Sequence, residues 1–201
     1  MAIVIETTSE ASVTGVTDNS VAKPTGLTVG DLMIAQSGVN NQTATVIPPA
    51  GWSTANYQQS PGGGSSGENV FIHYKIADIG DVASSIFTFS CVANQALRTI
   101  ILRVSGIDTT NPLSTTNKAL NGSISGAGTK TFANTVTPSK SGSLLIASFV
   151  ADNVNISVDN VAITNDNPTW TKQYNDTITQ MYSAIRTEST ATGDMTTDQW
   201  V

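Results

Sequence analysis

The sequence predicts an all-β protein, a jelly-roll-like antiparallel β-sandwich, and three observations lead to that prediction. Apolar residues occur in short runs or alternate with polar ones, and Gly, Pro, Asn and Asp bound these runs, which is typical of strands joined by turns. Only 12% of the 201 residues are charged, about half the average for globular proteins, while Thr, Ser, Asn and Gly are abundant. No stretch keeps a 3.6-residue apolar period with helix caps, so we expect little helix.

The candidate strands are short and run along the whole chain. In the first half they are Ile3–Glu6, Ser12–Val16, Asp31–Ser37, Trp52–Gln58, Val70–Ala77, Ser85–Ser90 and Leu97–Val104. In the second half they are Thr131–Val136, Ser143–Ala151, Val154–Val158, Trp170–Tyr174, Ile178–Arg186 and Thr196–Val201. Hydrophobic residues make up 39% of the chain, which is enough for a core.

The clearest alternation between two faces occurs in the aromatic strand near residue 74. Phe71, His73 and Lys75 share one face, and Ile72, Tyr74 and Ile76 share the other. We expect the second face to be buried. On that assignment His73, the only histidine, is an exposed strand residue.

The two halves of the chain, about 24–113 and 131–201, resemble each other in the order of their segments. The matched pairs are Pro24–Ala35 with Pro138–Ala147, Trp52 with Trp170, Val70–Ala77 with Thr179–Ile185, and Ser85–Ser90 with Thr196–Val201. The match is one of order and residue type rather than identity. Each unit has a strand with at least three consecutive apolar residues, which should lie centrally with material on both faces. Two such units facing each other would make a sandwich.

Residues 1–23 are predicted to form an N-terminal strand that reaches a neighbour as an arm, ahead of a sandwich domain at 24–201. The start, Met1–Glu6, lacks a basic region and a long apolar stretch, so we expect no signal peptide. The longest apolar-rich run, Leu144–Ala151, is too short to cross a bilayer.

Residues that could carry catalysis or bind a metal are few. A catalytic triad would have to centre on His73, and one histidine with one cysteine cannot form a His/Cys metal cluster. The single cysteine, Cys91, excludes an intrachain disulfide and is expected to be a small core residue. Aspartates such as Asp31 and Asp81 lie beside glycines and are expected in turns. We therefore predict no enzymatic activity, no cofactor and no metal site.

The charge balance weighs against nucleic acid as a partner. The formal net charge is −6, from 15 acidic and 9 basic residues, and no basic cluster occurs. Binding to a phosphate backbone needs several positive charges on one surface.

Several short motifs occur in a fixed order: Gly30–Ala35, Pro48–Trp52, Tyr74–Ala77, Phe87–Ser90 and Gly106–Leu113, followed by Gly142–Ala147 and Trp170. Together they resemble a domain of tailed-bacteriophage virion proteins and some bacterial surface proteins. The resemblance implies a capsid decoration or cement protein, or a tail or fibre component, that binds capsid or tail proteins. It also implies a homo-oligomer, a trimer, made in the host cytoplasm and located in the virion, with no membrane partner.

Two other functions stay open from the sequence. The first is a carbohydrate-binding module of a phage tail, fibre or cell-surface protein, in which exposed aromatic rings stack on sugars. Its candidate residues are Trp52, Tyr57, Trp170 and Tyr174. The second is a hydrolase with a pair of carboxylates assembled in space, for which the sequence offers no specific pair.

Overall fold

The computed structural model describes residues 3–41, 43–59, 69–113, 130–131, 143–150, 163–164, 171–175, 181–187 and 199–200. Nearly all regular structure in these ranges is antiparallel strand, so the prediction of an all-β fold is confirmed. The jelly-roll topology stays a prediction. The strand expected at 154–158 and most of the one expected at 131–136 lie outside the described residues.

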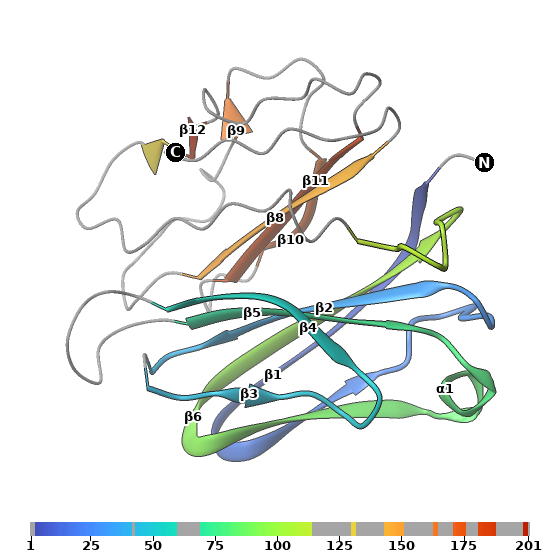
Figure 1. Cartoon of the computed structure of the whole chain (residues 1–201). Helices are drawn as coiled ribbons and strands as arrows, with labels where there is room; N and C mark the ends of the chain where they lie inside the picture. Colours follow the sequence, from blue (N-terminus) through green and yellow to red (C-terminus); the bar gives the residue numbers. More distant parts are fainter. Residues whose placement is uncertain are drawn as a thin grey trace.

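The main sheet has six strands in the order β1-β6-β2-β5-β4, with β3 paired to β6 (Figure 1). Their bounds are Val4–Ala22 for β1, Leu32–Val39 for β2, Val46–Ile47 for β3, Ser53–Gln59 for β4, Asn69–Ile76 for β5 and Ile86–Ser105 for β6. A five-residue helix, α1 (Ile79–Ala83), joins β5 to β6.

Two smaller sheets come from the second half of the chain. One has the order β10-β11-β8, with bounds Leu144–Val150 for β8, Thr171–Asn175 for β10 and Met181–Thr187 for β11. The other has the order β7-β12-β9, with bounds Lys130–Thr131 for β7, Ile163–Thr164 for β9 and Gln199–Trp200 for β12. Figure 1 shows β8, β10 and β11 stacked over β2 and β5.

β1 and β6 have 19 and 20 residues, and each runs through two layers of the molecule. Residues 4–13 of β1 pair with 97–105 of β6, and residues 18–22 pair with 86–90. Register shifts separate the two stretches, and such bulges bend a strand and increase its twist. The main sheet thus curls over its own face (Figure 1).

Each of these long strands was predicted as two shorter ones. In β6 the gap between the two predicted strands, residues 91–96, coincides with the register shift. In β1 the gap, residues 7–11, is regularly paired with β6, and its polar residues Thr7 to Glu10 concealed the continuity of the strand. The segment expected to be an N-terminal arm is, from Val4 to Ala22, a strand of this chain's own sheet, paired with β6.

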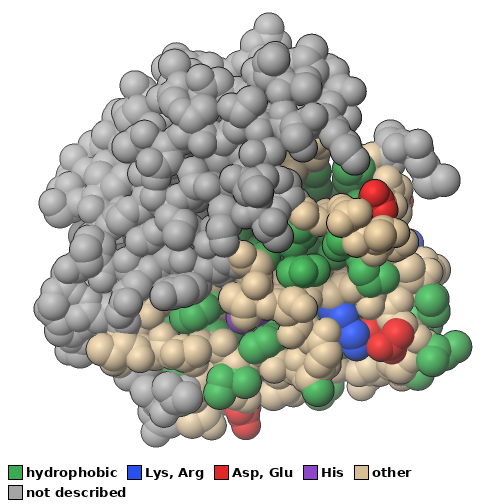
Figure 2. All heavy atoms as spheres, in the orientation of Figure 1, with side chains coloured by type: hydrophobic (Ala, Val, Ile, Leu, Met, Phe, Trp, Pro, Cys, Tyr) green, Lys and Arg blue, Asp and Glu red, His purple; other side chains and the backbone are tan. Residues whose placement is uncertain are grey.

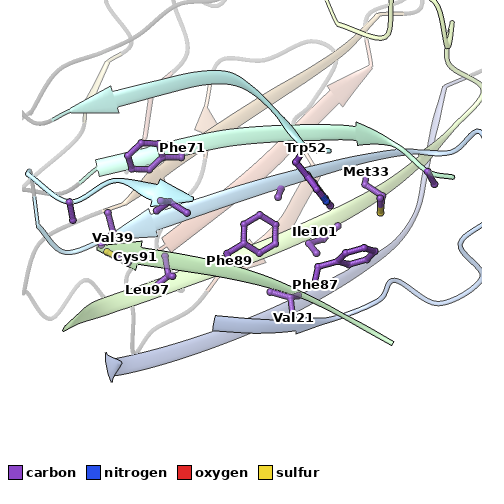
Figure 3. Packing of buried hydrophobic residues seen from close by; sticks show 14 of the residues in the cluster. Val21, Met33, Val39, Trp52, Phe71, Phe87, Phe89, Cys91, Leu97 and Ile101 are labelled. Carbon is purple, nitrogen blue, oxygen red and sulfur yellow. The ribbon is translucent and has the colours of Figure 1, made fainter. Parts of the chain in front are cut away.

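The inner core lies inside the curl and is rich in aromatic side chains (Figure 3). Trp52 packs edge-on against Phe87 and Phe89, with ring centroids 5.7 and 5.4 Å away. Cys91 is free and buried in this cluster, as predicted. Full burial of each large apolar side chain stabilises the fold by about 1.5–3 kcal/mol.

A second apolar cluster occupies the opposite face of β2. Leu32 and Ile34 belong to it, and Leu144 and Ile146 of β8 pack against it. Every residue of β2 is buried. The prediction that this apolar strand lies centrally, covered on both faces, is therefore confirmed.

The alternation predicted in β5 is present, but its faces were assigned wrongly. Phe71 and His73 are 6% and 1% exposed and face the inner core, so His73 is not an exposed strand residue. Ile72, Tyr74 and Ile76 are half-buried against the second cluster. The sequence pattern led to the wrong assignment because both faces of β5 are covered. A polar residue on one face therefore did not mean that this face is exposed to solvent.

Candidate functional site

Two cations and three carboxylates gather at one end of the inner core. We call this group the charged rim: Asp31, Lys75, Asp78, Asp81 and Arg103. Met33 of β2 is paired with Lys75 of β5 on one side and with Arg103 of β6 on the other. Residues directly opposite in antiparallel strands share a face, so the two cations flank Met33 in one row. Figure 2 shows basic and acidic side chains in contact on the visible face.

Arg103 and Asp31 form one half of the charged rim. Arg103 Nε donates to Asp31 Oδ2 at 2.7 Å, and the same oxygen accepts from Thr28 N at 2.9 Å and Thr28 Oγ1 at 2.8 Å. Burial alone would raise the pKa of Asp31, but the hydrogen bonds from Arg103 and Thr28 hold it below its usual value. The ion pair fixes the turn that leads into β2.

Lys75 forms the other half by joining β5 to the start of α1. Its Nζ lies 2.8 Å from Asp81 Oδ1 and 3.0 Å from Asp78 Oδ2. The two aspartates also cap the helix, because Asp81 N donates to Asp78 Oδ1 at 3.0 Å and Asp78 N donates to Asp81 Oδ2 at 2.9 Å. Burial lowers the pKa of Lys75, yet the two carboxylates raise it above its usual value overall.

Glycines let the backbone pass close to both cations. A Cβ at Gly26, where φ is +74°, would lie 2.8 Å from Arg103 Nη1. A Cβ at Gly51, where φ is +83°, would lie 3.3 Å from Lys75 Nζ. Both positions therefore require glycine for its positive φ and for the space above the cation.

The charged rim can act as a clamp. Each of its carboxylates lies against a cation, and the Lys23 ammonium donates to the carbonyl oxygen of Val82 in α1. The pKa values of Asp31, Lys75 and Asp78 move away from neutrality, and that of Asp78 is lowered by the backbone N–H of Asp81 and then by Lys75. General acid–base catalysis needs the opposite, a pKa close to the working pH.

His73 is held inside the inner core. Its Nδ1 lies 3.1 Å from Thr54 Oγ1, its ring stacks on Phe71 with centroids 6.0 Å apart, and Nε2 has no partner among the described residues. Burial lowers the pKa of His73 to about 4, so the ring is neutral at pH 7. A substrate outside the sheet cannot reach this imidazole. Within the described ranges, no group of three or more His, Cys, Asp or Glu could hold a metal ion.

Of the four aromatic residues proposed to stack on sugars, the structure describes the side chain of Trp52 alone. Trp52 is 9% exposed, and its ring lies in the inner core against two phenylalanines, which counts against a stacking role at this position. Tyr57 and Tyr174 lie on β4 and β10, but their side chains are outside the described residues, as is all of Trp170.

Sequence reasoning missed the charged rim as a group. It identified Asp31 and Asp81 as turn residues, and both do lie at the start of an element. The spacing Asp78-x-x-Asp81 was the available signal, since it is a capping pattern ahead of a short helix. No comparable pattern indicated Arg103, which lies 72 residues from Asp31.

Comparison with family models, curated proteins and solved structures gave no match for this chain. The resemblance to phage virion proteins therefore rests on the motifs alone. The one helix in the described ranges, α1, is too short to span a membrane.

Proposed function

We propose that this chain is a non-enzymatic structural protein of a virion, which decorates or cements a phage capsid by binding coat subunits. The observation that carries the proposal is the charged rim, whose ionised groups are committed to one another and to the loops they hold. Such an arrangement suits a rigid binding surface better than a reaction centre. The proposed location in a virion rests on the order of the short motifs and on the resemblance that they carry.

The motifs behind the resemblance have architectural roles in the described structure. Gly30–Ala35 carries Asp31 and the buried start of β2, and Pro48–Trp52 brings Trp52 into the inner core. These roles support a protein whose motifs maintain a framework. The proposed assembly is a homotrimer that binds neither nucleic acid nor membrane.

The surface proposed to meet the coat subunits lies beside the charged rim. Val29 and Ile79 are 62% and 81% exposed, the two highest values among the large apolar side chains of the described residues. Their turns are joined, because Gly30 N donates to the Ala77 carbonyl at 2.9 Å. Together the two joined turns offer two exposed apolar side chains that a partner could cover. The rim clamps both turns, so the anchors are ordered before binding.

The test uses virions of the source phage that were assembled without this chain. Purified protein added to these particles should co-sediment at a fixed number of copies per particle. In solution its mass should be three times the 20.9 kDa of the single chain. Protein that stays in the supernatant would contradict the proposal, and binding to glycans instead would favour the carbohydrate-binding alternative.

Matched variants locate the contact. Ile79→Asp should abolish co-sedimentation, because a carboxylate would replace an apolar anchor at the contact. Val16→Asp, at another exposed apolar position, 43% exposed in β1, should leave binding unchanged. Equal loss of binding in both variants would show that this end of the molecule is not the contact surface.

A further inference from the structure

Two three-stranded parts of the molecule have the same construction. In β2-β5-β4 and in β8-β11-β10, the strand that comes first in the sequence pairs with the third, and the third pairs with the second. All four pairings are antiparallel. We infer that these parts are two copies of one duplicated unit, packed on each other through the same face. This inference does not depend on the proposed function.

The strand register aligns the two copies residue by residue. Residues 32–35 read Leu-Met-Ile-Ala and residues 144–147 read Leu-Leu-Ile-Ala. Ile34 is opposite Tyr74, and Ile146 is opposite Ile185. On that register Lys75 corresponds to Arg186 and Phe71 to Tyr182, so a cation and an aromatic residue recur at matched positions.

The second pairing in each unit carries a bulge at the same place. Ser53 is opposite Tyr74 and Thr171 is opposite Ile185, so these two strands start at matched positions. The register then shifts between Thr54 and Asn56 in one copy, and between Lys172 and Tyr174 in the other. In the sequence a tryptophan immediately precedes each strand. Bulges are built features of a strand pair, so a shared bulge position argues for shared construction.

The two copies also meet through matched residues. Leu32 and Ile34 belong to the second apolar cluster, and Leu144 and Ile146, at the corresponding positions of the other copy, pack against that cluster. Contact through the same patch on both partners is the arrangement of an isologous dimer. Here both partners belong to one chain, and each unit covers an apolar face that a single unit would expose.

The shared unit ends at three strands. Among the described strands, β2 is flanked by β5 and β6, whereas β8 is paired with β11 alone. Among the described strands, β6 and β1 therefore extend the first unit only. The correspondence between the units covers β2, β4 and β5 in the first and β8, β10 and β11 in the second.

A graft between the copies tests the inference in the full chain. Residues 171–175 are replaced by Ser-Thr-Ala-Asn-Tyr, the sequence of residues 53–57, which keeps the bulge residue. The graft should unfold cooperatively with a Tm within about 5 °C of the parent. A control graft of Ser-Thr-Asn-Tyr, without the bulge residue, should lower the Tm much further. Equal Tm values for two folded grafts would overturn the inference.

Smaller changes keep the test valid where grafts disturb folding. Gln173→Ala retains the bulge and should leave the Tm unchanged. Ala55→Gly, at the matched position of the first copy, also retains the bulge and should lower the Tm by only about 1–4 °C. Deletion of Gln173 should lower the Tm by a shift comparable with that from deletion of Ala55, since each deletion forces the residues before it onto the opposite face. A deletion of Gln173 without effect would contradict the duplication.

Discussion

His73 shows how one buried side chain links packing to pH. Its ring lies between Phe71 and Phe89, with centroids 6.0 and 6.2 Å away, and only Nδ1 has a described hydrogen-bond partner, the hydroxyl of Thr54. A protonated imidazole would need an acceptor at both nitrogens. Burial therefore favours the neutral ring and lowers the pKa from 6.5 to about 4.

The lowered pKa predicts a loss of stability in acid. The folded pKa is below the unfolded value, so this contribution is fully present above pH 6.5 and is lost as the pH falls towards 4. Between pH 7.5 and pH 5 the free energy of unfolding should fall by about 2 kcal/mol from this group. Urea unfolding of the parent and of His73→Phe isolates the effect, because carboxylates titrate in both proteins. Identical pH profiles would show that His73 is not responsible.

Gln36 is a polar residue inside an apolar contact. It is fully buried on the face of β2 that carries the second apolar cluster, and neither amide atom has a partner among the described residues. Its cross-strand neighbours are Ile72 and Ile100. A buried amide without hydrogen bonds costs roughly 1–3 kcal/mol of stability.

Replacement of Gln36 by methionine should therefore stabilise the protein. Methionine has a similar length and fills irregular apolar space, so we expect the free energy of unfolding to rise by about 1 kcal/mol. Urea unfolding measures the change. Ser37→Ala is the matched control: Ser37 Oγ is 2.9 Å from Thr99 Oγ1, so that variant should destabilise the protein. A destabilised Gln36→Met variant would mean that the amide is satisfied in solution.

At the scale of elements, the turn before β2 depends on two glycines with different surroundings. Gly26 and Gly30 have φ values of +74° and +93°. A Cβ at Gly26 would lie 2.8 Å from Arg103 Nη1, while a Cβ at Gly30 would meet nothing within 4 Å. Alanine at either position is strained by about 1–2 kcal/mol because of the left-handed backbone.

The difference in stability between the Gly26→Ala and Gly30→Ala variants measures how much the packing of the turn over Arg103 contributes. Gly30→Ala should cost about 1–2 kcal/mol, and Gly26→Ala should cost more, because Arg103 must also move from its place beside Asp31. Chemical denaturation of both variants gives the difference. If both variants lose the same stability, the packing over Arg103 contributes nothing to the turn.

The strands differ in how far their residues could predict them. Residues 32–35 are continuously apolar, and that run correctly predicted a strand covered on both faces. The polar His73 indicated the wrong side of β5, because a histidine that stacks on Phe71 can be buried without charge. A bulge in β6 and a polar, regularly paired stretch in β1 interrupted the apolar pattern, so the local pattern could not show that each is one strand.

For the whole molecule, sequence order indicated the construction better than sequence identity. The repeated order of an apolar strand, a tryptophan and an aromatic strand matches the order of β2, β4 and β5 with β8, β10 and β11. The strand register changes the alignment of the two aromatic strands, because Val70 then corresponds to Met181 and not to Thr179. The charged rim was not predictable as a group, because Asp31 and Arg103 meet only through the pairing of β2 with β6.

The contact between the two units should be measurable as an energetic coupling. Ile34→Ala and Ile146→Ala each remove apolar volume from the second cluster, so each should destabilise the protein, with Ile34→Ala costing about 2–5 kcal/mol. Because both side chains belong to one packed group, the double variant should differ from the sum of the single variants by at least about 0.5 kcal/mol.

A second double-mutant cycle tests whether the coupling acts through the face of β2 that carries the second apolar cluster. Ile101 lies in the inner core, on the opposite side of the sheet from Ile146. Ile101→Ala combined with Ile146→Ala should therefore be additive within about 0.5 kcal/mol. Urea unfolding at pH 7.5, where His73 is neutral, gives all the required values. Additivity in both cycles would show that β8 does not pack on β2 in solution, and the two units would then be separate layers without a shared core.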